Sequence, residues 1–171
     1  MTAPPLEPLR ALEARLRALE DAEAIRRLKA RYAELVDARY AAGTVRPKAE
    51  VDALAERIAA LFTEDAVWDA GGSLGLCRGR AAIRERMASP TLHFSRHYFV
   101  NPQIEVAGDA ATARWELIAP CTTRDDRAMW MTGVEEDRYE RVGGKWLHAA
   151  MKLTVVFMAP HERGWVRRAS G

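Results

Sequence analysis

Two residues sixty positions apart, Asp37 and His97, offer the most clearly defined chemistry in this sequence. Asp37 closes the helix-like segment 30–37, and His97 opens the strand-like segment 97–104. A carboxylate that bonds one ring nitrogen of a histidine fixes its tautomer. It also stabilises the imidazolium that forms when the other nitrogen takes a proton. If the fold joins the two residues at a hydrophobic pocket, they form a general base, so an enzyme is the leading hypothesis.

The amino-terminal third has the periodicity of helices. One apolar stripe recurs every three or four residues, at Leu9, Leu12, Leu16 and Leu19. Such a stripe is a packing face, either against this chain or against a neighbouring subunit. Asp21 is a suitable N-cap for a second helix, which carries its own apolar stripe and ends near Gly43.

The remaining sequence alternates short elements and then long strands. A third helix is expected from Lys48 to Phe62, and a small helix from Arg80 to Ala88. Strands are expected at 66–69, 74–77, 96–106, 110–121, 127–141 and 145–158. This order predicts an α+β domain in which a curved antiparallel sheet wraps around the amino-terminal helices. A deep pocket would then lie between the two layers.

Several short pieces, in this order along the chain, carry a resemblance to a known family. They are Ala24-Ile25-Arg26-Arg27-Leu28, Leu61-Phe62-Thr63-Glu64-Asp65, Gly79-Arg80-Ala81-Ala82-Ile83, His97 ahead of Asn101-Pro102, and Asp137-Arg138-Tyr139 ahead of Gly144-Lys145-Trp146. The arrangement resembles the SnoaL-like branch of the nuclear transport factor 2-like superfamily, whose fold is a cone-shaped α+β barrel. The resemblance covers 21–160, which leaves an amino-terminal helical extension at 1–20 and a tail at 161–171.

The resemblance implies roles for three residues. In the dehydratases and the dehydrochlorinase of this superfamily, a helical Asp orients a His that abstracts a proton, and Asp37 and His97 match these positions. Tyr32 matches a tyrosine that binds or protonates the leaving group. Its spacing from Asp37 separates the two by about 140° around a helix. The alternatives are a core histidine, a solvated helix-end carboxylate and a core tyrosine whose hydroxyl reaches water.

The sequence departs from bile-acid dehydratase at two positions. An acidic residue that follows an Arg-Trp pair there is Ala119 here, and an arginine of the last strand aligns near Val155. These changes leave the base in an apolar cavity suited to an aromatic or polycyclic substrate. The residues expected to line it are Trp68, Phe99, Trp115, Leu117, Ala119, Trp130 and Met151, although aromatic residues also dominate protein cores.

Composition limits the partners. The 26 Lys and Arg nearly balance the 24 Asp and Glu, and no basic patch with interleaved aromatics suggests nucleic acid. No apolar run of roughly 20 residues suggests a membrane span. His93 and His97 have a ligand-like spacing, but the segment between them is not helical, so neither a metal nor a cofactor is expected. Cys77 and Cys121 fit reduced thiols in a cytoplasmic protein.

Together these patterns predict a cofactor-independent lyase of the dehydratase type, or an isomerase, acting on a small hydrophobic molecule. An epoxide-type hydrolase could use the same dyad to activate water. The rival class is a binding or assembly module like the small subunit of ring-hydroxylating dioxygenases, because fold alone does not decide function. Self-association is expected, with a homotrimer favoured and a dimer as the alternative.

Overall fold

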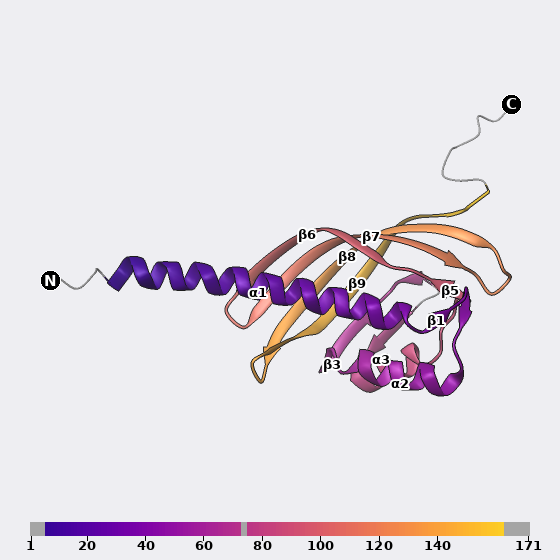
Figure 1. The fold of residues 1–171 in the computed structure, drawn as a ribbon, viewed down its shortest axis with the longest axis horizontal. Helices are drawn as coiled ribbons and strands as arrows, with labels where there is room; N and C mark the ends of the chain where they lie inside the picture. The colour runs from indigo at the N-terminus through magenta and orange to yellow at the C-terminus, as the bar shows by residue number, and fades with distance from the viewer. Residues whose placement is uncertain (1–5, 73–74, 163–171) are drawn as a thin grey trace, which may run out of the picture.

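A long helix crosses one face of a curved sheet, and two short helices close one end of the space between them (Figure 1). The computed structural model describes residues 6–72 and 75–162. The predicted α+β class with a cone-like curved sheet is confirmed. The sheet itself stays open, because its outer strands do not pair with each other.

The amino-terminal third is one helix, α1 (Leu6–Asp37). The prediction of a second helix beginning at Asp21 was wrong, because neither Gly nor Pro interrupts the helix-forming residues between Leu9 and Asp37. The Asp21 carboxylate instead accepts a hydrogen bond from Trp146 Nε1 at 3.1 Å and pairs with Arg141 at 2.7 Å. It therefore ties α1 to the last two strands rather than capping a helix.

Two shorter helices follow, α2 (Lys48–Ala59) and α3 (Arg80–Met87). α2 stops earlier than the sequence predicted, because Phe62 already belongs to the next strand. The buried faces of α2 and α3 pack against the end of α1 and form a core cluster whose most buried members include Ala55, Ile58, Phe62 and Ile83. This cluster fixes the end of α1 at which Asp37 lies.

The main sheet has seven strands: β3 (Phe62–Asp69), β4 (Leu76–Arg78), β5 (Phe94–Ser95), β6 (Tyr98–Ala107), β7 (Ala110–Thr122), β8 (Ala128–Val142) and β9 (Lys145–Pro160). Their order is β4-β3-β9-β8-β7, and both β5 and β6 pair with the free edge of β7. The four long predicted strands correspond to β6–β9. β3 runs parallel to β9, so the sheet is mixed rather than wholly antiparallel as predicted. A small ribbon, β1 (Tyr40–Ala41) with β2 (Thr44–Val45), follows α1.

Two of the register shifts in the sheet have a clear local cause. β6 shifts register between Val100 and Gln103, where Asn101 has a φ of 50° and Pro102 has no N–H to donate. β8 and β9 shift register next to Gly133, at which a Cβ would lie 2.7 Å from Leu153 Cδ1. A side chain at position 133 would therefore collide with β9 where the two strands curve.

The ends of the chain were predicted as separate regions. Residues 6–20 of the predicted extension belong to α1. Residues 1–5 and most of the tail at 161–171 lie outside the described residues. Leu74 of the predicted strand 74–77 also lies outside them. Cys77 and Cys121 are both free thiols, as expected. In the described ranges, no helix is long and apolar enough to cross a membrane.

Candidate active site

Asp37 and His97 are in direct contact. The ring Nδ1 of His97 lies 2.7 Å from Asp37 Oδ1, and the backbone N–H of His97 donates to Asp37 Oδ2 at 3.1 Å. The Asp37 side chain is 5 % exposed and that of His97 is 16 % exposed. With Nδ1 held by the carboxylate, Nε2 is the ring nitrogen left to accept a proton.

Local backbone geometry places the two residues. Asp37 is the last residue of α1, and His97 lies in the two-residue break, Arg96 and His97, between the edge strands β5 and β6. The residues on either side of His97 pair with β7: the Arg96 N–H donates to Pro120 O at 3.1 Å, and Tyr98 lies opposite Ile118. The His97 N–H bonds Asp37 instead of a strand, so the sheet edge and the helix end are joined at the dyad.

A cavity of about 640 Å³ opens beside the dyad. His97 and Tyr32 both line it, together with Trp68 and Leu117 from the predicted set. Further lining residues come from α3, the 90–95 segment and the inner faces of β7–β9; they include Met87, Leu92, Cys121, Met131, Leu153 and Met158. The volume falls within the 300–1,000 Å³ that is usual for small-molecule pockets.

Tyr32 and Trp68 form a hydrogen-bonded pair on the cavity wall. Trp68 Nε1 donates to the Tyr32 hydroxyl oxygen at 3.1 Å. Burial raises the pKa of Tyr32 well above its ordinary value, so the group stays a neutral hydroxyl. Because its oxygen already accepts from Trp68, the Tyr32 O–H is left to donate to a molecule in the cavity.

Five other residues predicted for the pocket lie elsewhere. Phe99 stacks on the His97 ring, with centroids 6.1 Å apart. Trp115, Ala119 and Met151 are buried in the core clusters. Trp130 lies near the end of β9, where its Nε1 donates to His161 Nδ1 at 3.2 Å. None of the five is among the cavity-lining residues.

A buried charged cluster, formed by Lys29, Glu135 and Asp137, extends from the cavity into the core. Lys29 Nζ bonds both the Glu135 carboxylate and Asp137 Oδ2, the latter at 2.7 Å. Tyr139 donates to the same Asp137 oxygen at 2.7 Å and accepts from Trp115 Nε1 at 3.1 Å. Of this cluster only Glu135 lines the cavity. It supplies an acidic group from β8 to a pocket that the sequence suggested was apolar.

The charges of this cluster do not balance. Two carboxyl groups share one buried ammonium, so a fully ionised cluster would carry a net negative charge away from water. Burial raises the pKa of Glu135, and repulsion from Asp137 adds to the rise while Lys29 opposes it. The raised pKa favours the protonated form of Glu135, in which the cluster would be neutral, and the carboxyl group of this residue faces the cavity.

A family model of the SnoaL-like domain matches residues 49–152, which is more than half of the sequence. The chain belongs to the SnoaL-like domain family. No curated protein matches it.

Solved structures give the same fold for this SnoaL-like protein. A type 2 hexachlorocyclohexane dehydrochlorinase has a TM-score of 0.69 at 19 % identity, over 89 % of this chain and 95 % of that chain. A candidate scytalone dehydratase from Novosphingobium aromaticivorans has a TM-score of 0.68 at 22 % identity, over 88 % and 92 %. An NTF2-like protein with a cystatin-like fold, also from Novosphingobium aromaticivorans, has a TM-score of 0.67 at 26 % identity, over 85 % and 88 %.

Arginines add positive charge to the cavity of this SnoaL-like protein. Arg39 is buried, and its Nε and Nη1 donate to Val36 O at 2.9 Å and to Met87 O at 3.0 Å. Arg86 and Arg124 line the same cavity from α3 and from the β7–β8 turn. The fixed guanidinium of Arg39 favours an electron-rich oxygen on whatever enters. Within 6–72 and 75–162, no three His, Cys, Asp or Glu side chains form a cluster suited to a metal ion.

Lys29, Glu135 and Arg39 were not predicted as site residues, although the periodicity of the sequence places Lys29 and Glu135 at buried positions. Lys29 follows Ile25 by four residues on the buried face of α1. Glu135 shares the alternation of Met129 and Met131, which point inward from β8. Opposite charges at core positions of two elements indicate a buried ion pair. Nothing in the sequence marks Arg39, which follows the end of α1.

Proposed function

We propose that this protein is a cofactor-independent lyase of the elimination type, with Asp37 and His97 as its base. The observation that carries the proposal is the 2.7 Å bond between His97 Nδ1 and Asp37 Oδ1 beside an open cavity. Two of the similar structures bear names of elimination enzymes, a dehydrochlorinase and a candidate dehydratase. At 19 % and 22 % identity these two structures support only the fold. The proposed chemistry rests on Asp37 and His97 of this chain.

The proposed reaction begins with proton removal from an activated carbon. His97 Nε2 takes the proton, and the electrons of the broken C–H bond form a carbon–carbon double bond. The bond from the neighbouring carbon to its oxygen breaks, and that oxygen leaves with the electron pair. Asp37 stabilises the imidazolium that forms, and base catalysis of this kind contributes on the order of a hundred- to ten-thousandfold in rate.

Glu135 is the proposed proton donor to the leaving oxygen. It lines the cavity and is held by Lys29, and burial next to Asp137 raises its pKa, which favours the protonated form. A charge on His97 lowers the pKa of Glu135, so the base and the acid are coupled. When His97 becomes an imidazolium, Glu135 releases its proton more readily. The departing oxygen then leaves as water, and proton exchange with solvent resets both groups.

Tyr32 is proposed to hold the leaving or carbonyl oxygen of the substrate. Its hydroxyl is neutral, lines the cavity and is oriented by Trp68. Arg39 adds a fixed positive charge on the same wall. Together they favour a substrate with an apolar ring system and at least one electron-rich oxygen, such as a hydroxylated or carboxylated aromatic or polycyclic compound.

Isomerisation is the second candidate reaction, and the same residues would carry it out. Return of the proton from His97 to a different carbon would shift a double bond without loss of a group. Hydrolysis by a water activated at His97 is a third option. A purely structural module is disfavoured by the open cavity, because a packed interior would leave no space beside the dyad.

A screen in deuterated water tests the proposal. The protein is incubated with hydroxylated aromatic and polycyclic compounds, and products are analysed by mass spectrometry and proton NMR. Elimination gives an alkene whose mass is lower by one water. Isomerisation loses no group and gives a product in which a hydrogen has been replaced by deuterium. His97→Ala should abolish either signal while circular dichroism and the thermal midpoint stay near those of the wild type. Turnover that survives His97→Ala would contradict the proposed base.

A further inference from the structure

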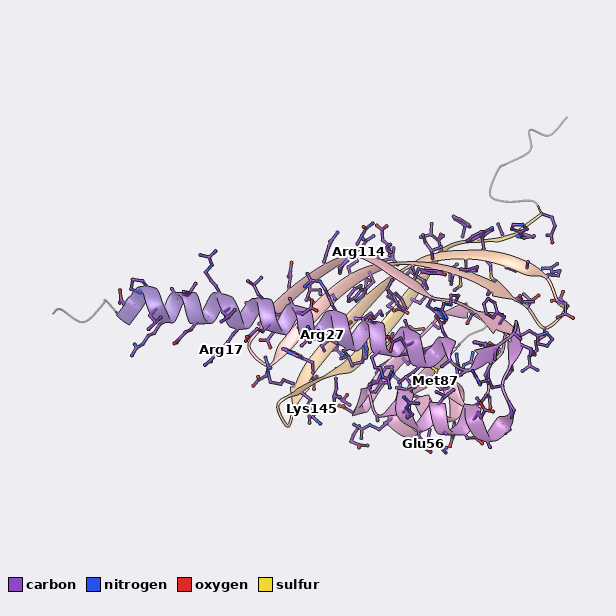
Figure 2. All side chains as sticks on the ribbon, viewed as in Figure 1. Arg17, Arg27, Glu56, Met87, Arg114 and Lys145 are labelled. Carbon is purple, nitrogen blue, oxygen red and sulfur yellow. The ribbon has the colours of Figure 1, made fainter. Side chains whose placement is uncertain are left out.

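The amino-terminal part of α1 extends past the end of the sheet (Figure 1). We call residues 6–20 the arm. Every described side chain from Glu7 to Glu20 is exposed, and Figure 2 shows Arg17 on this part of the helix, where it borders the β6–β7 turn. Fifteen helical residues span about 22 Å at 1.5 Å per residue. An arm of this length, which only borders the β6–β7 turn from Ala14 onward, is marginally stable as a helix.

The arm carries a row of exposed leucines. Leu9, Leu12, Leu16 and Leu19 are between 52 % and 69 % exposed. Single exposed apolar residues are common on protein surfaces, but a continuous row of four large side chains is typical of an interaction site. We call these four residues the leucine face.

The sheet of the same chain does not cover the leucine face. Ala14, Ala18 and Asp21 lie on the side of α1 that borders the β6–β7 turn, in a groove with Val106 and Asp109. At 100° per residue, the centre of the leucine face lies about 170° around the helix from this side. The leucine face therefore points away from its own sheet.

The spacing within the leucine face is that of a coiled coil. The steps from Leu9 to Leu12, Leu16 and Leu19 are three, four and three residues, which places leucine at the a and d positions of two heptads. The next a and d positions are Glu23 and Arg26, which are charged. The apolar seam is thus confined to the part of the helix that protrudes.

The charged residues beside the seam favour a parallel arrangement. In this register Arg15 takes a g position, and Glu13 and Glu20 take e positions. In a parallel coiled coil, g faces e of the next heptad on the neighbouring helix, so Arg15 of each chain meets Glu20 of another. An antiparallel pair would instead bring Arg15 near Arg15 and Glu13 near Glu20, which are like charges.

We infer that the arm is a self-association segment that binds the arm of a second copy of this chain. The two helices pack in parallel and in register, with the leucine face in the seam and Arg15–Glu20 pairs along its edges. Because each sheet lies on the opposite side of its helix, the two bodies remain outside the seam. The same seam accommodates the favoured homotrimer or a dimer, since both are parallel coiled coils with g–e pairs.

The mass of the full-length protein in solution tests this inference. Sedimentation equilibrium over a wide range of concentrations should give a dimer or trimer for the wild type. Leu12→Glu should raise the dissociation constant about a hundredfold or more, because it places a charge in the seam. Ala11→Glu is the matched control, with the same charge change on the neighbouring residue outside the seam, and should keep the wild-type mass. A monomeric wild type, or equal masses for both variants, would overturn the inference.

Two further measurements test the parallel register. Arg15→Glu should weaken association about tenfold at low salt, and adding Glu20→Arg should restore it, because the double change rebuilds the pair with reversed sign. Leu9→Cys should form an intermolecular disulfide with its own counterpart under mild oxidation, because only a parallel, in-register seam brings the two ends together. Association through the leucines without this disulfide, or without rescue by the double variant, would exclude the parallel arrangement. The thermal midpoint of all variants should stay near that of the wild type, because the core of the protein lies outside the arm. The variants that lose association should lose only the helical signal of the arm in circular dichroism.

Discussion

The Asp37 carboxylate accepts two hydrogen bonds from His97, one from ring Nδ1 at 2.7 Å and one from the backbone N–H at 3.1 Å. The second bond matters as much as the first, because it fixes the carboxylate against the edge of the sheet. Arg96 Nε also lies 3.6 Å from Asp37 Oδ2, at an exposed position. The orientation of the His97 ring is thus set by the helix end and the strand together.

Asp37→Asn should invert the tautomer of His97. An amide can turn its NH₂ toward Nδ1, which then becomes an acceptor and leaves the proton on Nε2, where it blocks base catalysis. We expect kcat of the proposed reaction to fall about a hundred- to ten-thousandfold. Nitrogen NMR of the imidazole rings at alkaline pH measures the tautomer without any substrate. An unchanged protonated Nδ1 in the variant would contradict this account.

Tyr32→Phe should lower kcat while the cavity keeps its shape. The change removes a neutral hydroxyl that is oriented by Trp68, and loss of one such donor costs about a hundred- to a thousandfold. Tyr40→Phe is the matched control, because Tyr40 lines the same cavity and has no hydrogen bond from its hydroxyl within the described ranges. Steady-state kinetics should show a large loss for the first variant only. Equal losses would mean that Tyr32 acts through packing.

Periodicity in the sequence places Asp37 at a helix end and His97 at the start of a strand. The pairing of the two residues was predicted from the resemblance to the SnoaL-like branch, because both match its base positions, and periodicity alone does not bring them into contact. The single continuous α1 was missed because a good N-cap residue, Asp21, was read as a boundary although no helix breaker accompanies it. Capping residues mark a helix start only where the chain before them leaves the helix.

The acid in the pocket was missed for a different reason. The resemblance to bile-acid dehydratase directed attention to β7, where the position of its acidic residue is occupied by Ala119. The pocket was therefore predicted to lack a second carboxyl group. The structure supplies Glu135 from the neighbouring strand β8, at a residue paired with Leu153 of β9. Strand alternation places Glu135 on the inner face, but a burial pattern alone does not distinguish a cavity wall from a packed core.

Glu135→Gln should remove the proposed proton donor and keep the bond to Lys29. We expect a loss of about a hundred- to ten-thousandfold in kcat with little change in KM. In the wild type, activity should fall as pH rises through the raised pKa of Glu135, because the acid must be protonated to act. This alkaline limb should disappear from the pH profile of the variant. A variant with the wild-type profile would exclude Glu135 as the donor.

Lys29→Met should destabilise the fold through the buried cluster. It leaves Glu135 and Asp137 without their cation, and removing one partner of a buried ion pair costs about 3–5 kcal/mol. Urea unfolding monitored by circular dichroism measures the loss. The triple variant Lys29→Met with Glu135→Gln and Asp137→Asn should regain most of the stability, because no net charge then remains buried. A triple variant as unstable as Lys29→Met would mean that lost packing, not charge, is the cause.

His148 should make the fold sensitive to acid. It is fully buried between Phe62 and Tyr139, and neither ring nitrogen has a partner among the described residues. Burial lowers the pKa of His148 well below its ordinary value of 6.5, and Lys29 adds to the decrease. The unfolded chain therefore binds a proton below about pH 6.5 that the folded chain excludes, so folding stability is complete above this pH and falls beneath it.

His148→Leu tests this titration by removing the group at similar side-chain volume. Near pH 8 the free energy of unfolding should stay within about 1.5 kcal/mol of the wild type. Between pH 6 and pH 5, the wild type should lose up to about 1.4 kcal/mol more per pH unit than the variant, which is the value for one proton. Urea midpoints measured across this range give the two slopes. Parallel slopes would show that His148 takes up no extra proton on unfolding, and that acid sensitivity arises elsewhere in the chain.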